Sequence, residues 1–252
     1  MMQRFALAFG FAVVGLAQPP LVIPQIADGG GWTTTIVLLN NFTLNSARVE
    51  VTFRGGDGRK LAFPLQNYGA VNTMELELGS QTSTYLETAG LNPVPQVGSV
   101  QVNQLSGGSP VKAFAIFRQV VPGRPDFEAI APGMRPADFF TFPFDNTNGS
   151  TTSFAVVSLS LSGCAVSVSA IFDETGVQLT SGPKLLVDLN NNGHTAFAST
   201  DRLPEMASRR GHLTFAVPPL GCAPGGLAIL GLRFNATGPF TNLLPLSAFS
   251  NN

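Results

Sequence analysis

An internal duplication constrains the fold of this chain more than any other feature of its sequence. Residues 31–39 align with residues 149–157, so that Gly31 matches Gly149 at an offset of 118 positions. Later segments continue the match in unchanged order. The matched positions are alternating apolar residues and turn glycines, which a sheet requires. The sequence therefore predicts two copies of one sheet-forming unit, each of about 115 residues.

The offset between the two copies changes by one residue within a single predicted strand. Val49 and Val51 align with Val166 and Val168 at an offset of 117, whereas Phe53 aligns with Ile171 at 118. One copy must therefore carry an extra residue. We expect a β-bulge or an insertion between these points.

Alternation of apolar and polar residues predicts strands in both copies, and helical signals are scarce. The clearest strands are expected at residues 99–102, 112–116 and 166–170, with hairpin turns at Asp57-Gly58 and Thr175-Gly176. We predict an all-β fold of two tandem antiparallel β-sandwiches of the immunoglobulin-like kind, at residues 24–135 and 141–246. A single larger sandwich or barrel built from both halves is the alternative.

Three local features add detail to this prediction. The continuous apolar run at 227–232 indicates a strand buried on both faces, or a short buried helix. Residues 201–207 can form one short helical turn, with Asp201 near its start. Arg118 and Arg233 recur in both copies, which predicts a shared structural contact.

The first residues resemble a secretory signal peptide. Arg4 precedes an uncharged apolar run that ends at Ala17, and Pro19 and Pro20 follow at once. The run is too short for a bilayer span, which needs about 20 residues. We predict a signal peptide at residues 1–17, cleaved after Ala17, and a protein that is secreted or held at the cell surface.

Charge and cysteine content narrow the class of protein further. The sequence has 14 Lys and Arg against 15 Asp and Glu, for a net charge of -1, which argues against a nucleic-acid partner. Its two cysteines are Cys164 and Cys222. In an oxidising compartment such a pair predicts one disulfide bond.

Residues suited to hydrolysis are few. Ser199 and Asp201 lie near His194, but no Gly-x-Ser-x-Gly elbow presents a nucleophile. Glu75 and Glu77 share one face of a predicted strand, where a solvated surface is the expected role. We therefore expect that the protein is not an enzyme.

One segment matches the first half of a calcium-binding loop. Asp188, Asn190 and Asn192 precede Gly193 at the spacing of that loop, and oxygen ligands are what Ca²⁺ needs. The twelfth position is Ser199 instead of glutamate. We expect a polar hairpin turn, no cofactor, and at most weak binding of calcium.

Aromatic side chains provide the candidate ligand-binding residues. Trp32 is the only tryptophan, and a sugar-stacking platform could combine it with Tyr68 or Tyr85. A place in the core is the alternative for Trp32.

Several segments of the sequence resemble tandem β-sandwich modules of secreted bacterial proteins of unassigned function. They lie at residues 26–34, 143–149, 192–197 and 230–241, and the resemblance spans nearly the whole mature chain. It implies export and a β-rich fold, and it brings no catalytic residues.

Together these features favour a secreted, non-enzymatic structural or adhesive protein at the cell surface. Its partner would be a glycan or a protein, and low charge with exposed strand edges would also permit self-association. A carbohydrate-binding module is the alternative. An extracellular hydrolase has the least support.

Overall fold

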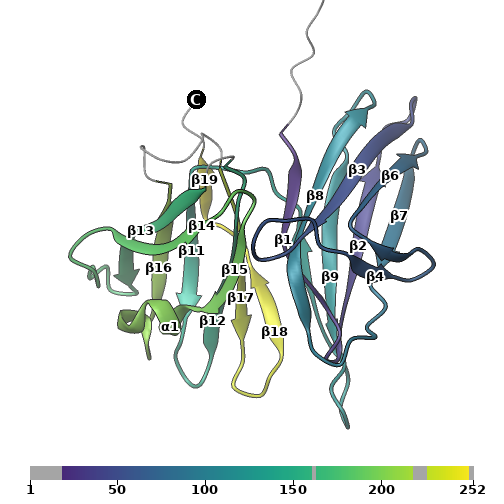
Figure 1. Cartoon of the computed structure of the whole chain (residues 1–252). Helices are drawn as coiled ribbons and strands as arrows, with labels where there is room; N and C mark the ends of the chain where they lie inside the picture. Colours follow the sequence, from purple (N-terminus) through teal and green to yellow (C-terminus); the bar gives the residue numbers. More distant parts are fainter. Residues whose placement is uncertain (1–18, 161–162, 218–225, 250–252) are drawn as a thin grey trace, which may run out of the picture.

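The computed structural model describes residues 19–160, 163–217 and 226–249, and within them the chain is all-β, as predicted (Figure 1). The predicted signal peptide lies in residues outside this part. The strands of the first half are β1 (Leu21–Asp28), β2 (Trp32–Asn40), β3 (Ala47–Arg54), β4 (Phe63–Leu65), β5 (Gly69–Val71), β6 (Thr73–Leu78), β7 (Thr82–Glu87), β8 (Gln96–Ser106), β9 (Lys112–Gln119) and β10 (Phe127–Pro132).

The second half carries the remaining strands and two short helical segments. These are β11 (Phe139–Asp145), β12 (Thr151–Ser158), β13 (Cys164–Asp173), β14 (Lys184–Leu189), β15 (His194–Ala198), α1 (Ser199–Arg202), η1 (Pro204–Met206), β16 (Arg210–Ala216), β17 (Leu227–Phe234), β18 (Phe240–Leu243) and β19 (Ser247–Phe249). The helical segments lie where a single turn at 201–207 is predicted, but α1 begins at Ser199. Neither helix in the described residues is long enough to cross a membrane.

The two halves have the same strand order. In the first half, one antiparallel sheet has the order β1-β8-β3-β6 and the other the order β10-β9-β2-β7. In the second half, β11, β16, β13 and β14 repeat the first order, and β18, β17, β12 and β15 repeat the second. The first half adds the β4-β5 hairpin, and the second half adds β19 beside β11.

Each half has a hydrophobic core between its two sheets. In the first half, Val49 and Val100 from one sheet share a buried cluster with Ile36 and Ala115 from the other. In the second half, Phe142 belongs to a second cluster together with residues of the facing sheet. Since each pair of open sheets encloses one core, the architecture is consistent with β-sandwiches.

The sheet of β12 and β17 is covered on both faces. Phe154 and Val156 of β12 belong to the core of the second half, whereas Ala155 packs into the core cluster of the first half. Val157 packs against Val22 of β1, which lies at the boundary between the halves (Figure 1). Residues 227–231 of β17 are accordingly all buried. The prediction of a strand buried on both faces is confirmed, and the docked first half is its cause.

The register of β13 contains the predicted extra residue. Val168 lies opposite Phe215, and Ala170 lies opposite the adjacent Thr214, so Ser169 forms a bulge. Val51 and Phe53 of β3 pair with β8 without such a shift. The bulge therefore lies where the offset between the copies changes from 117 to 118.

The prediction that Arg118 and Arg233 make a shared contact is wrong. Arg118 lies opposite Thr33, but Arg233 lies opposite Thr152, which is equivalent to Thr34. A register difference of one residue turns a side chain to the other face of a sheet. Arg118 accordingly pairs with Asp126 at 2.6 Å, and Arg233 pairs with Asp145, which lies on β11.

Candidate functional site

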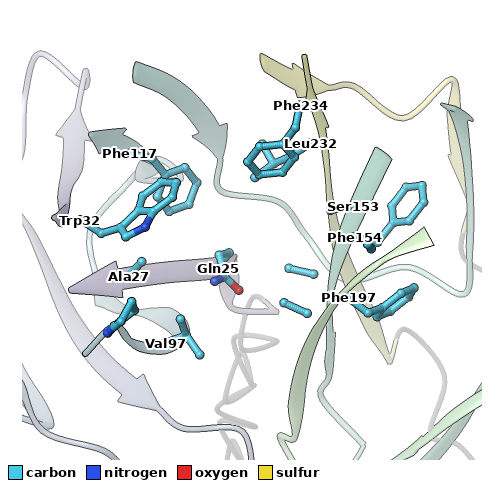
Figure 2. A pocket seen from close by; sticks show the side chains of 14 residues that line it. Gln25, Ala27, Trp32, Val97, Phe117, Ser153, Phe154, Phe197, Leu232 and Phe234 are labelled. Atoms are coloured by element: carbon cyan, nitrogen blue, oxygen red, sulfur yellow. The ribbon is translucent and has the colours of Figure 1, made fainter. Parts of the chain in front are cut away.

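An apolar pocket lies between the two halves (Figure 2). Its volume is about 340 Å³, and no charged side chain of the described residues lines it. The first half contributes side chains from β1, β2, β8 and β9, and the second half contributes side chains from β12, β15 and β17. The lining residues are Gln25, Ala27, Trp32, Pro95, Val97, Phe117, Ser153, Phe154, Ala155, Ala196, Phe197, Ala198, Leu232 and Phe234.

Trp32 is held at one wall of this pocket by the turn that precedes β2. Gly29 and Gly31 have positive φ angles of 85° and 86°, and the backbone groups of Gly29 and Trp32 form reciprocal hydrogen bonds. The indole packs on Phe240 of the second half, with ring centroids 5.3 Å apart. Phe240 in turn lies 5.4 Å from Phe234, which also lines the pocket. Trp32 is therefore a partly buried member of an aromatic cluster shared by both halves.

Gln25 reaches the pocket because β1 is irregular at that point. Ile23 lies opposite Val100, and Ile26 lies opposite Gly98, so β1 carries one more residue than β8 between them. This bulge turns the Gln25 side chain toward the second half, and Figure 2 shows it between the two walls. Pro24 fits there because β1 is an edge strand.

Gln25 makes a hydrogen bond across the boundary to His194. The Nε2 of His194 lies 2.7 Å from the Oε1 of Gln25, and the backbone N–H of His194 donates to the carbonyl of Gly56 at 3.0 Å. The His194 side chain is buried, and this burial lowers its pKa from 6.5 to about 4. The imidazole is neutral at pH 7 and carries one N–H. Because the amide oxygen of Gln25 can only accept, this proton lies on Nε2, which donates to Gln25.

A second, polar pocket of about 620 Å³ lies between two turns from opposite halves. Arg54 donates to Gln101 and to the carbonyl of Gly58, and Gln101 donates to the Oδ1 of Asn192 at 2.9 Å. Burial lowers the pKa of Arg54, although Glu50 partly offsets this shift. The bond from Gln101 to Asn192 links the two halves, and Gln101 lies on the face of β8 that points away from the core of the first half.

The three predicted glycan-binding residues do not lie together. Tyr85 lies opposite Val37 on β2, five residues along the strand from Trp32, which corresponds to roughly 17 Å. Tyr68 lies in the turn between β4 and β5. Both tyrosines are exposed, at 61% and 50%, and neither lines the apolar pocket.

The predicted calcium ligands occupy the end of β14 and the turn that follows. Asp188 is exposed on β14, and Asn190 accepts a hydrogen bond from the backbone of Gly193 through its carbonyl. The side-chain oxygen of Asn192 accepts from Gln101. No group of three or more His, Cys, Asp or Glu side chains suited to a metal ion occurs among the described residues. Calcium binding at this turn stays a prediction.

The side chains considered for hydrolysis have other partners. Ser199 is hydrogen-bonded to Asn146, at 3.0 Å from its amide nitrogen, whereas the imidazole of His194 contacts Gln25. Glu75 forms an ion pair with Arg48 on the surface. No hydrogen bond joins Ser199 and His194, both of which the structure describes.

The cysteine prediction falls partly outside the described residues. Cys164 begins β13 and is buried, with 4% of its surface exposed. Cys222 lies in the segment that the structure does not describe. The disulfide bond between them stays a prediction.

The outer face of the first half's sheet β10-β9-β2-β7 carries a row of apolar side chains that sequence analysis missed. Tyr85, Val37, Phe114 and Pro132 lie opposite one another on β7, β2, β9 and β10. Beside them, Glu87, Thr35, Ile116 and Ile130 form a second row. Tyr85 and Ile130 are exposed. These eight side chains are called the outer face below; alternation within β9 is the signal that indicates them.

Comparisons of this chain with models of protein families, with curated proteins and with solved structures find no match.

Proposed function

We propose that this protein is an exported, non-enzymatic structural or adhesive protein that associates with a second copy through its outer face. In this proposal the two halves are tandem immunoglobulin-like β-sandwiches, stabilised by a disulfide bond between Cys164 and Cys222. The apolar run that ends at Ala17 supports export.

A single observation carries the proposal: the sheet of β12 and β17 is buried against the first half, whereas its equivalent in the first half has exposed apolar side chains on its outer side. In the second half, Ala155 and Leu230 lie opposite each other and are buried against the first half. The equivalent pair in the first half is Val37, which is 3% exposed, and Phe114, which is half-buried. No described segment of the chain packs over the exposed Tyr85 and Ile130 beside this pair. Exposed apolar patches of this kind are typical of interaction sites.

The charges around the outer face favour a copy of the same face as the partner. Arg118 and Lys112 lie on β9, and Glu87 and Glu128 lie on the two flanking strands. Arg118 is paired with Asp126 of its own copy. When two such faces meet about a twofold axis, Lys112 can approach an acidic side chain of the other copy. Burial of the apolar side chains within the two rows would supply the affinity.

Sedimentation across a wide range of protein concentration tests this proposal. The wild-type protein should change from monomer to dimer as its concentration rises. Tyr85→Lys and Ile130→Lys should each weaken the dimer by about tenfold or more, because each buries a charge within the interface. Tyr68→Lys is the matched control, since Tyr68 is exposed to a similar extent but lies off the outer face. A monomer at every concentration, or equal effects of Tyr68→Lys and Tyr85→Lys, contradicts the proposal.

A carbohydrate-binding module is the second candidate, and the exposed ring of Tyr85 beside the polar Thr35 favours it. A sugar could stack on this ring and bond to hydroxyl groups of the sheet. Glycan-array binding that Tyr85→Ala abolishes, by a protein that stays monomeric, would support this candidate over self-association.

A further inference from the structure

We propose that the apolar pocket between the halves binds a small, neutral aromatic compound that carries a carbonyl oxygen. The pocket is independent of the outer face, because Trp32 and Phe117 point to the inner side of β2 and β9. Both halves supply its walls, so the complete site exists only when they are docked.

The size and lining of the pocket limit the ligand. A volume of about 340 Å³ is near the lower end of the range for small-molecule sites, which suits a compound of one or two rings. Trp32, Phe117 and Phe234 present aromatic rings to the cavity (Figure 2). Such rings favour an aromatic guest through offset and edge contacts. A charged guest would lose its hydration without gaining a partner, since no charged described side chain lines the pocket.

The side chain of Gln25 determines which kind of polar group the ligand should carry, a hydrogen-bond donor or an acceptor. Its Oε1 accepts the hydrogen bond from His194, which leaves the two N–H groups of its Nε2 as donors. No acceptor among the described residues is hydrogen-bonded to this nitrogen. A donor in an apolar cavity favours a ligand that brings an acceptor, and a carbonyl oxygen provides one. His194 therefore fixes the orientation of Gln25 and acts as a positioning residue.

The fluorescence of Trp32 provides a direct measurement, because it is the only tryptophan in the sequence. The probes are 2-acetylnaphthalene and 2-ethylnaphthalene, which have the same ring system and differ in the carbonyl oxygen. We expect saturable quenching by both, with tighter binding of the ketone. Absence of saturable quenching by the ketone up to its solubility would overturn the proposal.

Two substitutions locate the site and test the hydrogen bond. Ala196 is exposed and lines the pocket, so Ala196→Phe should fill the cavity and abolish binding without disturbing the core. Ala70→Phe, at an exposed position of β5, is the matched control and should bind normally. Gln25→Leu should weaken binding of the ketone by roughly fivefold and leave that of the alkyl probe nearly unchanged.

Comparison of the two probes separates the donor from a general change in pocket shape. Equal losses for both probes in Gln25→Leu would overturn the role of Gln25. Normal binding by Ala196→Phe would place the probe elsewhere and overturn the site. Because Ala196→Phe changes an exposed residue, this second test does not depend on the stability of the Gln25 variant.

Discussion

Thr34 and Thr152 occupy equivalent positions in the two halves and make the same pair of hydrogen bonds. The Thr34 hydroxyl accepts from the backbone N–H of Ala27 at 3.0 Å and donates to its carbonyl at 2.8 Å. Thr152 bridges Asp145 in the same way, at 2.9 and 3.1 Å. The duplicated sequence therefore preserves buried polar contacts as well as strand order.

The surfaces of the two halves have diverged, in contrast to these buried contacts. The edge strand β1 has a bulge at Pro24 and Gln25 and packs against the second half. Its equivalent β11 pairs with β16 in unbroken register and is covered by β19. The side of the β12–β17 sheet that points away from its own core is likewise buried, against the first half. The same side of the β2–β9 sheet forms the outer face. Equivalent positions at the sheet edges and outer surfaces therefore have different roles in the two halves: some pack between the halves, and others form the outer face.

The largest expected effect of this divergence is at the sheet position of Leu230 and its equivalent Phe114. Leu230 is 1% exposed and packs against the first half, so Leu230→Ala should lower the free energy of unfolding by about 3 to 4 kcal/mol. Phe114 is only half-buried, and Phe114→Ala should cost roughly 1 kcal/mol. Urea unfolding at low protein concentration measures both. Similar losses would mean that docking of the halves adds no stability at this position.

The second prediction concerns acid, because only the second half has a buried histidine at the boundary. Burial lowers the pKa of His194 from 6.5 to about 4, so the unfolded chain binds this proton more readily than the folded protein. Its contribution to stability is complete above pH 6.5 and falls as the pH decreases toward 4. This lowering of the pKa of His194 corresponds to a decrease of about 3 kcal/mol in the free energy of unfolding between pH 7 and pH 4.

Unfolding free energies measured between pH 7 and pH 4 test this. His194→Gln should make the free energy of unfolding depend less steeply on pH. His212→Gln, at a partly exposed histidine that stacks on Phe172, should leave this dependence as it is in the wild-type protein. The lowered pKa values of Asp145 and Asp173 affect stability mainly below their ordinary value of 3.8, outside this window. An unchanged slope in His194→Gln would refute the assignment.

Features that depend on strand periodicity could be predicted from the sequence. The change of offset between Val168 and Ile171 located the bulge, since an extra residue must be accommodated within a paired strand. The apolar run of β17 indicated burial on both faces. Arg118 and Arg233 were misassigned because similar residues can lie one register position apart, and one position reverses the face.

The pocket could not be predicted, because it depends on how the halves dock. Gln25 and Trp32 lie far in the sequence from Phe197 and Phe234, and no periodicity relates them. The role of Gln25 also depends on a bulge in β1 that has no equivalent in β11. Two copies of one pattern specify two similar cores, but contacts between the copies involve residues that the repeat does not share.

The smallest predicted effect, a difference of about 2 kcal/mol, compares two equivalent turn glycines. Gly58 and Gly176 have nearly the same φ angle, at +80° and +83°, so an alanine at either position adopts an unfavourable left-handed conformation that costs about 1 kcal/mol. A Cβ at Gly58 would also lie 1.9 Å from the carbonyl oxygen of Asn191 in the second half, whereas a Cβ at Gly176 has no atom within 4 Å. Overpacking of this kind costs about 1 to 3 kcal/mol more.

Gly58→Ala should therefore lower the free energy of unfolding by about 3 kcal/mol and Gly176→Ala by about 1 kcal/mol in urea titrations. Because the shared strain cancels in the difference, equal losses would show that the Asn191 turn moves away freely and that the halves are not held together at this contact.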